Sequence, residues 1–249
     1  LTARFFLTMI IVDANNWFRM KLYSTTFLGV RDVVMELIRL KPDVLVWDGF
    51  RANDRRRAYF ADYKRNRKER DLDTDFRFLN LIRKARSYFP LTSLDADYCE
   101  ADDVIAWLCG NEPDVKHTIL STDKDLCAIP NAVNPLVKKE LCERRWVHLY
   151  KTLVGDQSDG IGGLSRFGKV GFQKLTYGDK QLIEYSLDCG RLLEGVPMKE
   201  RLEKEWDNLL VFWKITDFMP VPLDKLHGII VKSYDEKPLF DFLDKEGVL

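Results

Sequence analysis

Short apolar runs rich in β-branched residues alternate along this chain with longer segments of helical periodicity. The runs, each of which we interpret as a strand, lie at residues 5–12, 44–47, 118–120 and 146–149. The segments 30–40 and 76–85 carry apolar residues at helical spacing and are predicted to be core helices. This alternation is typical of a parallel sheet with helices on its faces. The sequence therefore predicts an α/β fold with a mainly parallel central sheet.

The second part of the chain has a different pattern. After about residue 150 the strand signal disappears, and glycine-rich punctuation introduces helical segments. The longest predicted helix spans residues 198–218, with Pro197 suited to its start and Pro220 just beyond its end. We therefore expect an α/β core over residues 1–150, with a basic segment at about 51–75, and a helical region over 151–249.

Composition excludes several classes of protein. The 249 residues include 39 Lys and Arg and 39 Asp and Glu, so a polyanion has to bind a local patch rather than an overall positive charge. No apolar run approaches the roughly 20 residues of a membrane span. The run 5–12 ends at Asp13 without a small-residue cleavage site, which disfavours a secretory signal. Five scattered cysteines disfavour a disulfide framework and a zinc site, and favour a reducing cytoplasm.

Three of the predicted strands run into aspartate. Asp13 follows the first run, Asp48 the second, and Asp123 and Asp125 follow the third. A single aspartate after a strand is commonly a turn residue or a helix N-cap. Because the carboxyl ends of parallel strands meet at one edge of a sheet, however, three such acids are expected to converge there.

Two further acidic clusters lie later in the chain. Glu100, Asp102 and Asp103 open a predicted helix, and Asp156 and Asp159 precede a glycine-rich stretch. A helix dipole stabilises an acid by only about 0.3–1 kcal/mol, so crowded carboxylates of this kind indicate a bound cation.

The donor set predicts the kind of cation. Oxygen ligands without clustered Cys or His select hard ions, so we expect Mg²⁺, with Mn²⁺ as a substitute. The candidate ligands are Asp13, Asp48, Glu100, Asp102, Asp103, Asp123, Asp125, Asp156 and Asp159. Nine carboxylates exceed what one ion uses, and two ions about 3.5–4 Å apart are the usual device for in-line displacement at phosphorus.

A basic segment follows Asp48 directly. Residues 51–70 contain nine basic side chains and three acidic ones, with Tyr59, Phe60 and Tyr63 among them. Such a mixture suits phosphate neutralisation and base stacking. A solvated helix face is the alternative, which the position beside the acidic edge disfavours.

The stretch 160–171 is rich in glycine. It is predicted to form a tight turn between helices whose N–H groups hold a DNA phosphate, with Arg166, Lys169 and Lys174 nearby. A flexible surface loop has the same composition. The position directly after Asp156 and Asp159 favours the nucleic-acid role.

Taken together, these segments resemble the 5′-nuclease superfamily of flap endonucleases and 5′ to 3′ exonucleases, and look most like the exonucleases of short-tailed bacteriophages. The motifs that carry the resemblance, in family order over about residues 9–175, are Val12-Asp13-Ala14-Asn15, Trp47-Asp48-Gly49, Tyr63-Lys64-Arg65-Asn66-Arg67, Glu100-Ala101-Asp102-Asp103, Ser121-Thr122-Asp123-Lys124-Asp125 and Gly155-Asp156-Gln157-Ser158-Asp159. The resemblance implies a PIN-like core, a short helical arch and a helix-three-turn-helix region.

The resemblance also implies residue roles. Asp48, Glu100, Asp102, Asp103 and Asp123 would surround one ion, Asp125, Asp156 and Asp159 the other, and Asp13 would bind through water. Lys64 and Arg67 would meet the scissile phosphate, and Tyr63 would stack on the terminal nucleotide. Independently of the resemblance, the basic segment and the glycine-rich stretch predict further DNA contacts from Arg56, Arg65, Gly163, Arg166, Gly168 and Lys169. A monovalent cation is expected at the hairpin.

Two departures from the family pattern shape the expected function. The usual Gly-Ile-Gly hairpin is here Arg166-Phe167-Gly168, so a side-chain contact from Arg166 is expected to replace a backbone one. Only 35 residues separate Lys64 from Glu100, so any arch is short and end-directed cutting is favoured.

The expected protein is a metal-dependent 5′ to 3′ exonuclease that acts as a monomer on the 5′ ends of DNA, and on RNA in RNA–DNA hybrids. Its expected setting is phage DNA replication, primer removal or recombination in the host cytoplasm. A structure-specific flap endonuclease is the alternative within the enzyme class. A catalytically inactive nucleic-acid-binding module is the alternative outside it.

Overall fold

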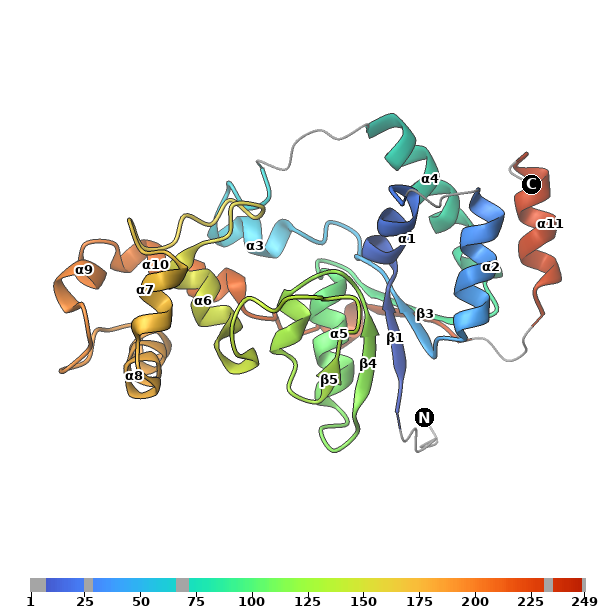
Figure 1. Ribbon diagram of the computed structural model, residues 1–249. Helices are drawn as coiled ribbons and strands as arrows, with labels where there is room; N and C mark the ends of the chain where they lie inside the picture. The colour runs from blue at the N-terminus through green and yellow to red at the C-terminus, as the bar shows by residue number, and fades with distance from the viewer. Residues whose placement is uncertain (1–7, 25–28, 66–71, 231–234, 248–249) are drawn as a thin grey trace. The chain divides into compact units, whose positions relative to one another are not determined.

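The computed structural model describes residues 8–24, 29–65, 72–230 and 235–247, with the backbone alone for 72–76 (Figure 1). The chain divides into two compact units. The sheet unit comprises Leu1–Ala52, Glu69–Lys138 and Pro220–Leu249, and the helical unit comprises Asn53–Lys68 and Lys139–Met219. The boundaries of these units differ from those of the predicted regions 1–150 and 151–249, because each unit is built from more than one segment of the chain.

The sheet unit is built on one sheet, whose strands in the described residues are β1 (Ile10–Asp13), β2 (Val44–Val46), β3 (Thr92–Ala96), β4 (His117–Leu120), β5 (Ala132–Val133) and β6 (Leu226–Ile229). Their order is β5-β4-β1-β2-β3-β6, and every neighbouring pair is parallel except β3 with β6. The predicted α/β class with a mainly parallel sheet is confirmed. Asp13 pairs with Val46 and Val12 with Leu120, so β1, β2 and β4 end at the same edge.

Helices cover the sheet because both of its faces are apolar, as expected for buried parallel strands. Val12, Leu45 and Trp47 pack with α1 (Ala14–Leu22), α2 (Val30–Leu40), α4 (Leu72–Ala85) and α11 (Lys237–Lys245) in one hydrophobic cluster. The helix α5 (Ala101–Gly110) contacts β1, β2 and β3. The predicted helix 30–40 is confirmed with the same bounds, and the one predicted at 76–85 starts earlier, at Leu72.

The helical unit has its own hydrophobic cluster, formed by Trp146, Leu149, Leu153, Phe172, Ile183, Leu209 and their neighbours. Its helices are α3 (Asp54–Tyr59), α6 (Val147–Val154), α7 (Lys169–Lys174), α8 (Tyr177–Asp188), α9 (Lys199–Glu203) and α10 (Trp206–Thr216). The short 3₁₀ helices in the described parts of both units are η1 (Arg86–Tyr88), η2 (Asp125–Ala128), η3 (Arg144–Trp146) and η4 (Leu223–Lys225). Among the helices that the structure describes, none combines the length and the apolar character needed to cross a membrane.

Three expectations about secondary structure are wrong. Residues 146–149 belong to η3 and α6, because Trp146, Leu149, Tyr150 and Leu153 bury one helical stripe, which a four-residue apolar run cannot distinguish from a strand. The segment 198–218 forms two helices, α9 and α10, rather than one. The strand signal does not end at residue 150, since β6 forms an antiparallel edge strand from half-exposed residues that carry little apolar pattern.

Candidate metal and nucleic-acid site

Asp13 ends β1 and caps α1. Its carboxylate accepts hydrogen bonds from the Asn16 amide (3.2 Å) and the Ser121 hydroxyl (2.9 Å), and only 7% of the residue is exposed. Burial raises the pKa of Asp13 to about 8, and the neighbouring carboxylates of Asp48 and Asp123 add to the shift. The three strand-end acids therefore lie close enough to repel one another.

Asp48, just past β2, connects two other parts of the sheet unit. Its carboxylate accepts a hydrogen bond from the Ala101 amide (2.9 Å) at the start of α5 and another from the Asn15 side chain. Gly49 follows it in close contact with the next loop, where an added Cβ would lie 1.7 Å from the Ala96 carbonyl oxygen. Glycine is thus required for Asp48 to approach α5.

The acids at the start of α5 are held by the helix N-terminus. Glu100 is the N-cap and forms a capping box with Asp103, whose carboxylate accepts a hydrogen bond from the Glu100 amide (3.1 Å). The carboxylate of Asp102 accepts from the Asp103 amide (2.8 Å). Glu100 and Asp103 are buried, so the helix dipole and these bonds offset part of the cost of placing charge there.

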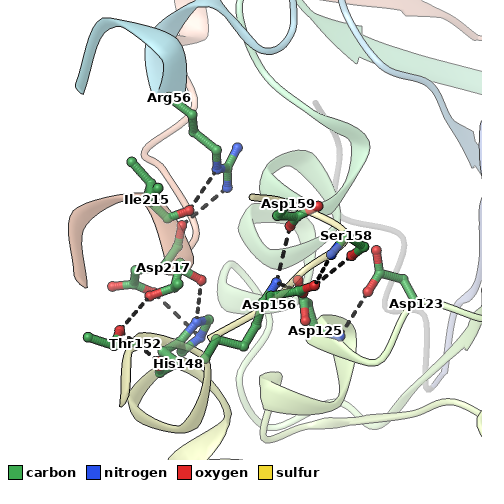
Figure 2. Close-up of polar contacts among 12 residues, drawn as sticks. Arg56, Asp123, Asp125, His148, Thr152, Asp156, Ser158, Asp159, Ile215 and Asp217 are labelled. Atoms are coloured by element: carbon green, nitrogen blue, oxygen red, sulfur yellow. Dashed lines mark hydrogen bonds and ion pairs between the residues drawn. The ribbon is translucent and has the colours of Figure 1, made fainter. Parts of the chain in front are cut away.

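The loop after β4 orients Asp123 through Ser121. The Ser121 oxygen accepts a hydrogen bond from the Asp123 amide (3.1 Å) while its proton goes to Asp13. The Asp123 carboxylate in turn accepts from the Asp125 amide (2.9 Å; Figure 2). These hydrogen bonds link the loop after β4 to the end of β1.

These residues fit a hard divalent cation. The donors in the sheet unit are carboxylate oxygens, which Mg²⁺ and Mn²⁺ prefer. Burial is the main reason that the pKa of Asp13 is raised, and the carboxylates of Asp48 and Asp123 add to it; a bound cation would oppose both effects.

The second set of acids lies in a tight turn of the helical unit. Asp156 and Ile161 exchange two backbone hydrogen bonds of 2.8 Å, which close the turn after α6. Ser158 donates to the Asp156 carboxylate from its amide (2.9 Å) and its hydroxyl (2.6 Å), as Figure 2 shows. Oxygens of Asp156 and Asp159 come within 4.8 Å of one another.

A buried lysine joins these two acids. Lys151, in the last turn of α6, is 3% exposed, and its ammonium lies 2.9 Å from Asp156 Oδ2 and 3.3 Å from Asp159 Oδ2. Burial alone would raise the pKa of Asp156, but Lys151 and the bonds from Ser158 outweigh it and lower that pKa. Our sequence analysis missed Lys151; the available signal was a single cation in an apolar helix, five residues before Asp156.

The helix that carries Lys151 is itself fixed in place. The Thr152 hydroxyl lies 3.0 Å from that of Thr216, and a ring nitrogen of His148 lies 2.6 Å from the Thr216 carbonyl oxygen (Figure 2). His148 also lies 3.5 Å from Asp217. These contacts hold α6 against the end of α10.

The basic residues predicted to contact DNA differ in their surroundings. The Lys64 amide donates to the Asp159 carbonyl (3.0 Å), and its ammonium lies 4.9 Å from the centre of the Tyr63 ring. Arg65 is exposed and pairs with Asp62 at 2.9 Å. Arg67 lies outside the described residues.

Two of the predicted DNA contacts are buried instead. Arg56 is 2% exposed and donates to the carbonyls of Ile215 (3.1 Å) and Asp217 (3.2 Å), so it holds the end of α10 (Figure 2). Tyr63 is 3% exposed within the cluster of the helical unit, with the Arg56 guanidinium 5.9 Å from its ring centre. Both side chains are therefore buried within the helical unit, a result of tertiary packing that local sequence does not reveal.

The glycine-rich stretch forms an irregular turn before α7. Gly163 has a φ of +67°, and a Cβ there would lie 2.5 Å from the Gly155 nitrogen, so glycine is required. Arg166 is exposed and also left-handed, with a φ of +56°. The Ser165 amide donates to the Glu205 carboxylate (3.0 and 3.2 Å), which ties the turn to the start of α10.

Gly168 and Lys169 stand at the start of α7. Gly168 is the N-cap, and a Cβ built on it would meet nothing within 4 Å. Lys169 is the first residue of the helix and is exposed. Both residues are therefore accessible on the helical unit.

The mainly parallel sheet, with acids at the ends of three strands and at a helix N-terminus, has the PIN-like 5′-nuclease fold. The family model described as 5′-3′ exonuclease, N-terminal resolvase-like domain, matches residues 8–150, more than half of the chain. The chain belongs to this family, and the expected relationship is confirmed.

Individual relatives agree with this assignment. DNA polymerase I of Caldicellulosiruptor bescii is 24% identical over 246 residues, which cover 88% of this chain and 29% of that protein, so the chain spans under a third of this curated relative. A structure of T5 5′-exonuclease with bound zinc ions has a TM-score of 0.65 at 17% identity, covering 97% of this chain and 99% of that one. A bacteriophage T5 flap endonuclease in a pseudo-enzyme–product complex with DNA and metal ions has a TM-score of 0.60 at 17% identity, covering 96% and 93%.

Proposed function

We propose that this protein is a divalent-metal-dependent 5′ to 3′ exonuclease that hydrolyses phosphodiester bonds of DNA. The observation that carries the proposal is the group of carboxylates at the ends of β1, β2 and β4, where burial first, and then the charges of Asp48 and Asp123, raise the pKa of Asp13 to about 8. A bound cation would favour the charged form of these carboxylates, and the chain belongs to a 5′-3′ exonuclease family.

The ligand roles follow the resemblance. Asp48, Glu100, Asp102, Asp103 and Asp123 would hold one Mg²⁺, Asp125, Asp156 and Asp159 the other, and Asp13 would act through water. When bound, two such ions supply an activated water and charge neutralisation at the leaving oxygen.

The protein's own groups would position the substrate. Lys64, anchored by its backbone to Asp159, is proposed to contact the scissile phosphate together with Arg67. Ser121 keeps Asp13 and Asp123 oriented through its two hydrogen bonds. The exposed Arg65, Arg166 and Lys169, with the turn at Gly163 and Gly168, are proposed to contact the duplex.

The oligomeric state, the biological setting and the range of substrates are also proposed. We propose a monomer that acts in phage DNA replication, primer removal or recombination in the host cytoplasm, on DNA and on RNA in hybrids, with a monovalent cation at the hairpin. The five cysteines are free thiols, which is compatible with that compartment.

A flap endonuclease is the second candidate, favoured by the likeness to the T5 flap endonuclease. The family pattern is shared by both activities, so the residues alone do not separate them. The short interval between Lys64 and Glu100 supports the exonuclease.

The decisive experiment uses one duplex labelled at its 5′ end or its 3′ end, with Mg²⁺ or with EDTA. We expect mononucleotides or short oligonucleotides to be released first from the 5′ label, only with Mg²⁺, and Asp123→Asn to abolish the release. A flap substrate labelled internally separates the second candidate, because an endonuclease releases the intact flap. Cleavage in EDTA, or release from the 3′ label first, would contradict the proposal.

A further inference from the structure

Phe50 is an exposed aromatic residue at the acidic edge of the sheet unit. It follows Asp48 by two residues and is 65% exposed, among the most exposed large apolar side chains of the described chain. A single exposed apolar side chain is normal on a protein surface, so the exposure of Phe50 gains meaning only from its surroundings.

The backbone around Phe50 is held firmly although its ring is exposed. The Gly49 amide donates to the Cys99 carbonyl (3.0 Å), and the Tyr98 amide donates to the Phe50 carbonyl (2.8 Å). These two bonds tie the loop after β2 to the residues just before Glu100. The ring thus projects from a fixed position beside two of the proposed metal ligands, Asp48 and Glu100.

Strained residues flank this position. Arg51 and Tyr98 both have left-handed backbones, with φ of +54° and +62°, which residues other than glycine, asparagine and aspartate rarely adopt. Such conformations cluster at functional sites, where the surroundings impose them. Here they accompany the turn that presents Phe50.

A cation lies next to the ring in sequence. The Arg51 guanidinium sits 5.8 Å from the centre of the Tyr98 ring. An exposed aromatic residue followed directly by a cation suits a nucleotide, because the base has a π-face and the phosphate carries the charge. Tyr63, the aromatic residue expected to stack, is buried and leaves that role open.

We propose that Phe50 stacks on the nucleobase next to the phosphodiester bond that is cleaved, and that Arg51 contacts the phosphate of the same nucleotide. The proposal deepens the proposed function and rests on it, since the ligand is the DNA substrate. Stacking tolerates any base, so Phe50 would position the strand end without selecting a sequence.

The test places 2-aminopurine at each of the first three nucleotides from the 5′ end of a duplex. Binding is measured in the Asp123→Asn background with Mg²⁺, where slow turnover allows equilibrium. We expect one position to lose fluorescence with Phe50 or Phe50→Trp, and to keep it with Phe50→Ala or Phe50→Leu. Phe50→Ala should weaken binding by about fivefold to about a hundredfold, the range for one stacked base.

Two comparisons make the result specific. Tyr23→Ala removes another exposed aromatic ring of the sheet unit and should change neither fluorescence nor affinity. Arg51→Met should lower the slope of log K against log salt by about 0.9, whereas Phe50→Ala should leave that slope unchanged. Melting temperatures of the Phe50 variants should match the parent, because the ring is exposed.

The outcomes separate this proposal from the proposed function. If the wild type binds and cleaves DNA but Phe50→Ala and Phe50→Leu quench 2-aminopurine as Phe50 does, the stacking role is wrong. If the wild type neither binds nor cleaves DNA, the proposed function itself is wrong, and this inference with it.

Discussion

The two acidic groups of this protein, one in each unit, show opposite electrostatics. In the sheet unit the neighbours of Asp13 are other carboxylates, and its pKa rises to about 8, chiefly through burial and then through Asp48 and Asp123. In the helical unit Asp156 is also partly buried, yet its pKa falls because Lys151 lies 2.9 Å away. The same residue type thus carries opposite shifts according to the nearest charge.

The difference implies different behaviour toward a divalent ion. An ion that joins the acids of the sheet unit relieves repulsion and displaces a proton from Asp13. An ion that joins Asp156 and Asp159 meets carboxylates already paired with an ammonium group. We expect the first group to respond to pH and metal together, and the second to depend on Lys151.

Removing Lys151 should have the largest effect. Lys151→Met leaves Asp156 and Asp159 without their buried cation and should lower the free energy of unfolding in EDTA by about 3–5 kcal/mol. Urea unfolding measures this loss. Saturating Mn²⁺ should recover part of it, since the ion can replace the ammonium.

Lys174→Met, which removes the same charge from an exposed site in the same unit, is the matched control and should change stability by less than about 0.5 kcal/mol. A Lys151→Met protein as stable as wild type in EDTA would mean that the two acids do not need this counter-charge.

Lys64 provides the next test, because its role should be kinetic rather than structural. Lys64→Ala should reduce the single-turnover cleavage rate by about 10²-fold, comparable to the loss of one donor to a developing charge. DNA affinity should fall much less. Rapid-quench kinetics and equilibrium binding separate the two. A change in salt-sensitive affinity with an unchanged chemical rate would make Lys64 a positioning residue.

The pH dependence of stability tests the contrast between the two acidic groups through Asp13. Its pKa is about 8 in the folded protein and 3.8 in the reference state, so between these values the native protein binds a proton that the unfolded chain does not. Stability in EDTA should therefore fall as pH rises from about 4 to about 8. Asp13→Asn should flatten this dependence by about 1 kcal/mol or more across the window.

Asp156→Asn is the control for that experiment. Its pKa is already lowered, so its titration falls below the window, and the slope between pH 5 and 8 should stay as in wild type. Equal slopes for wild type and Asp13→Asn would contradict the raised pKa of Asp13.

The contrast also explains what could be predicted from sequence. The acids at the sheet edge could be predicted from the sequence because acids such as Asp13 and Asp48 directly follow an apolar run. The parallel topology then brings the ends of these strands together. The pairing of Lys151 had only a weak signal, a single cation in an apolar helix, because lysine is mostly a surface residue and only packing shows that α6 is buried.

The burial of Arg56 has a similar origin. Arg56 was predicted to bind DNA because it lies in a basic run, and its guanidinium donates to two carbonyls at the end of α10. Partners remote in sequence can draw long side chains into the interior. The fold class could be predicted from local pattern, whereas the position of Arg56 depends on contacts with residues more than 150 positions away along the chain.

Replacing Arg166 should have the smallest effect of these substitutions. Arg166 is a charged residue of the helical unit that lies outside the pair of acids Asp156 and Asp159. Arg166→Ala should flatten the slope of log K against log salt by about 0.9, the contribution of one phosphate, and leave cleavage at saturating DNA unchanged. The loss should be greater on duplex than on single strands. Arg166→Gly removes the same guanidinium but relieves the left-handed backbone at φ +56°, so it should match Arg166→Ala in binding while being more stable by about 1 kcal/mol. Binding isotherms at several salt concentrations, with thermal melts of both variants, distinguish the lost contact from a disturbed turn; if binding recovers in Arg166→Gly, the turn's backbone and not the side chain contacts the duplex.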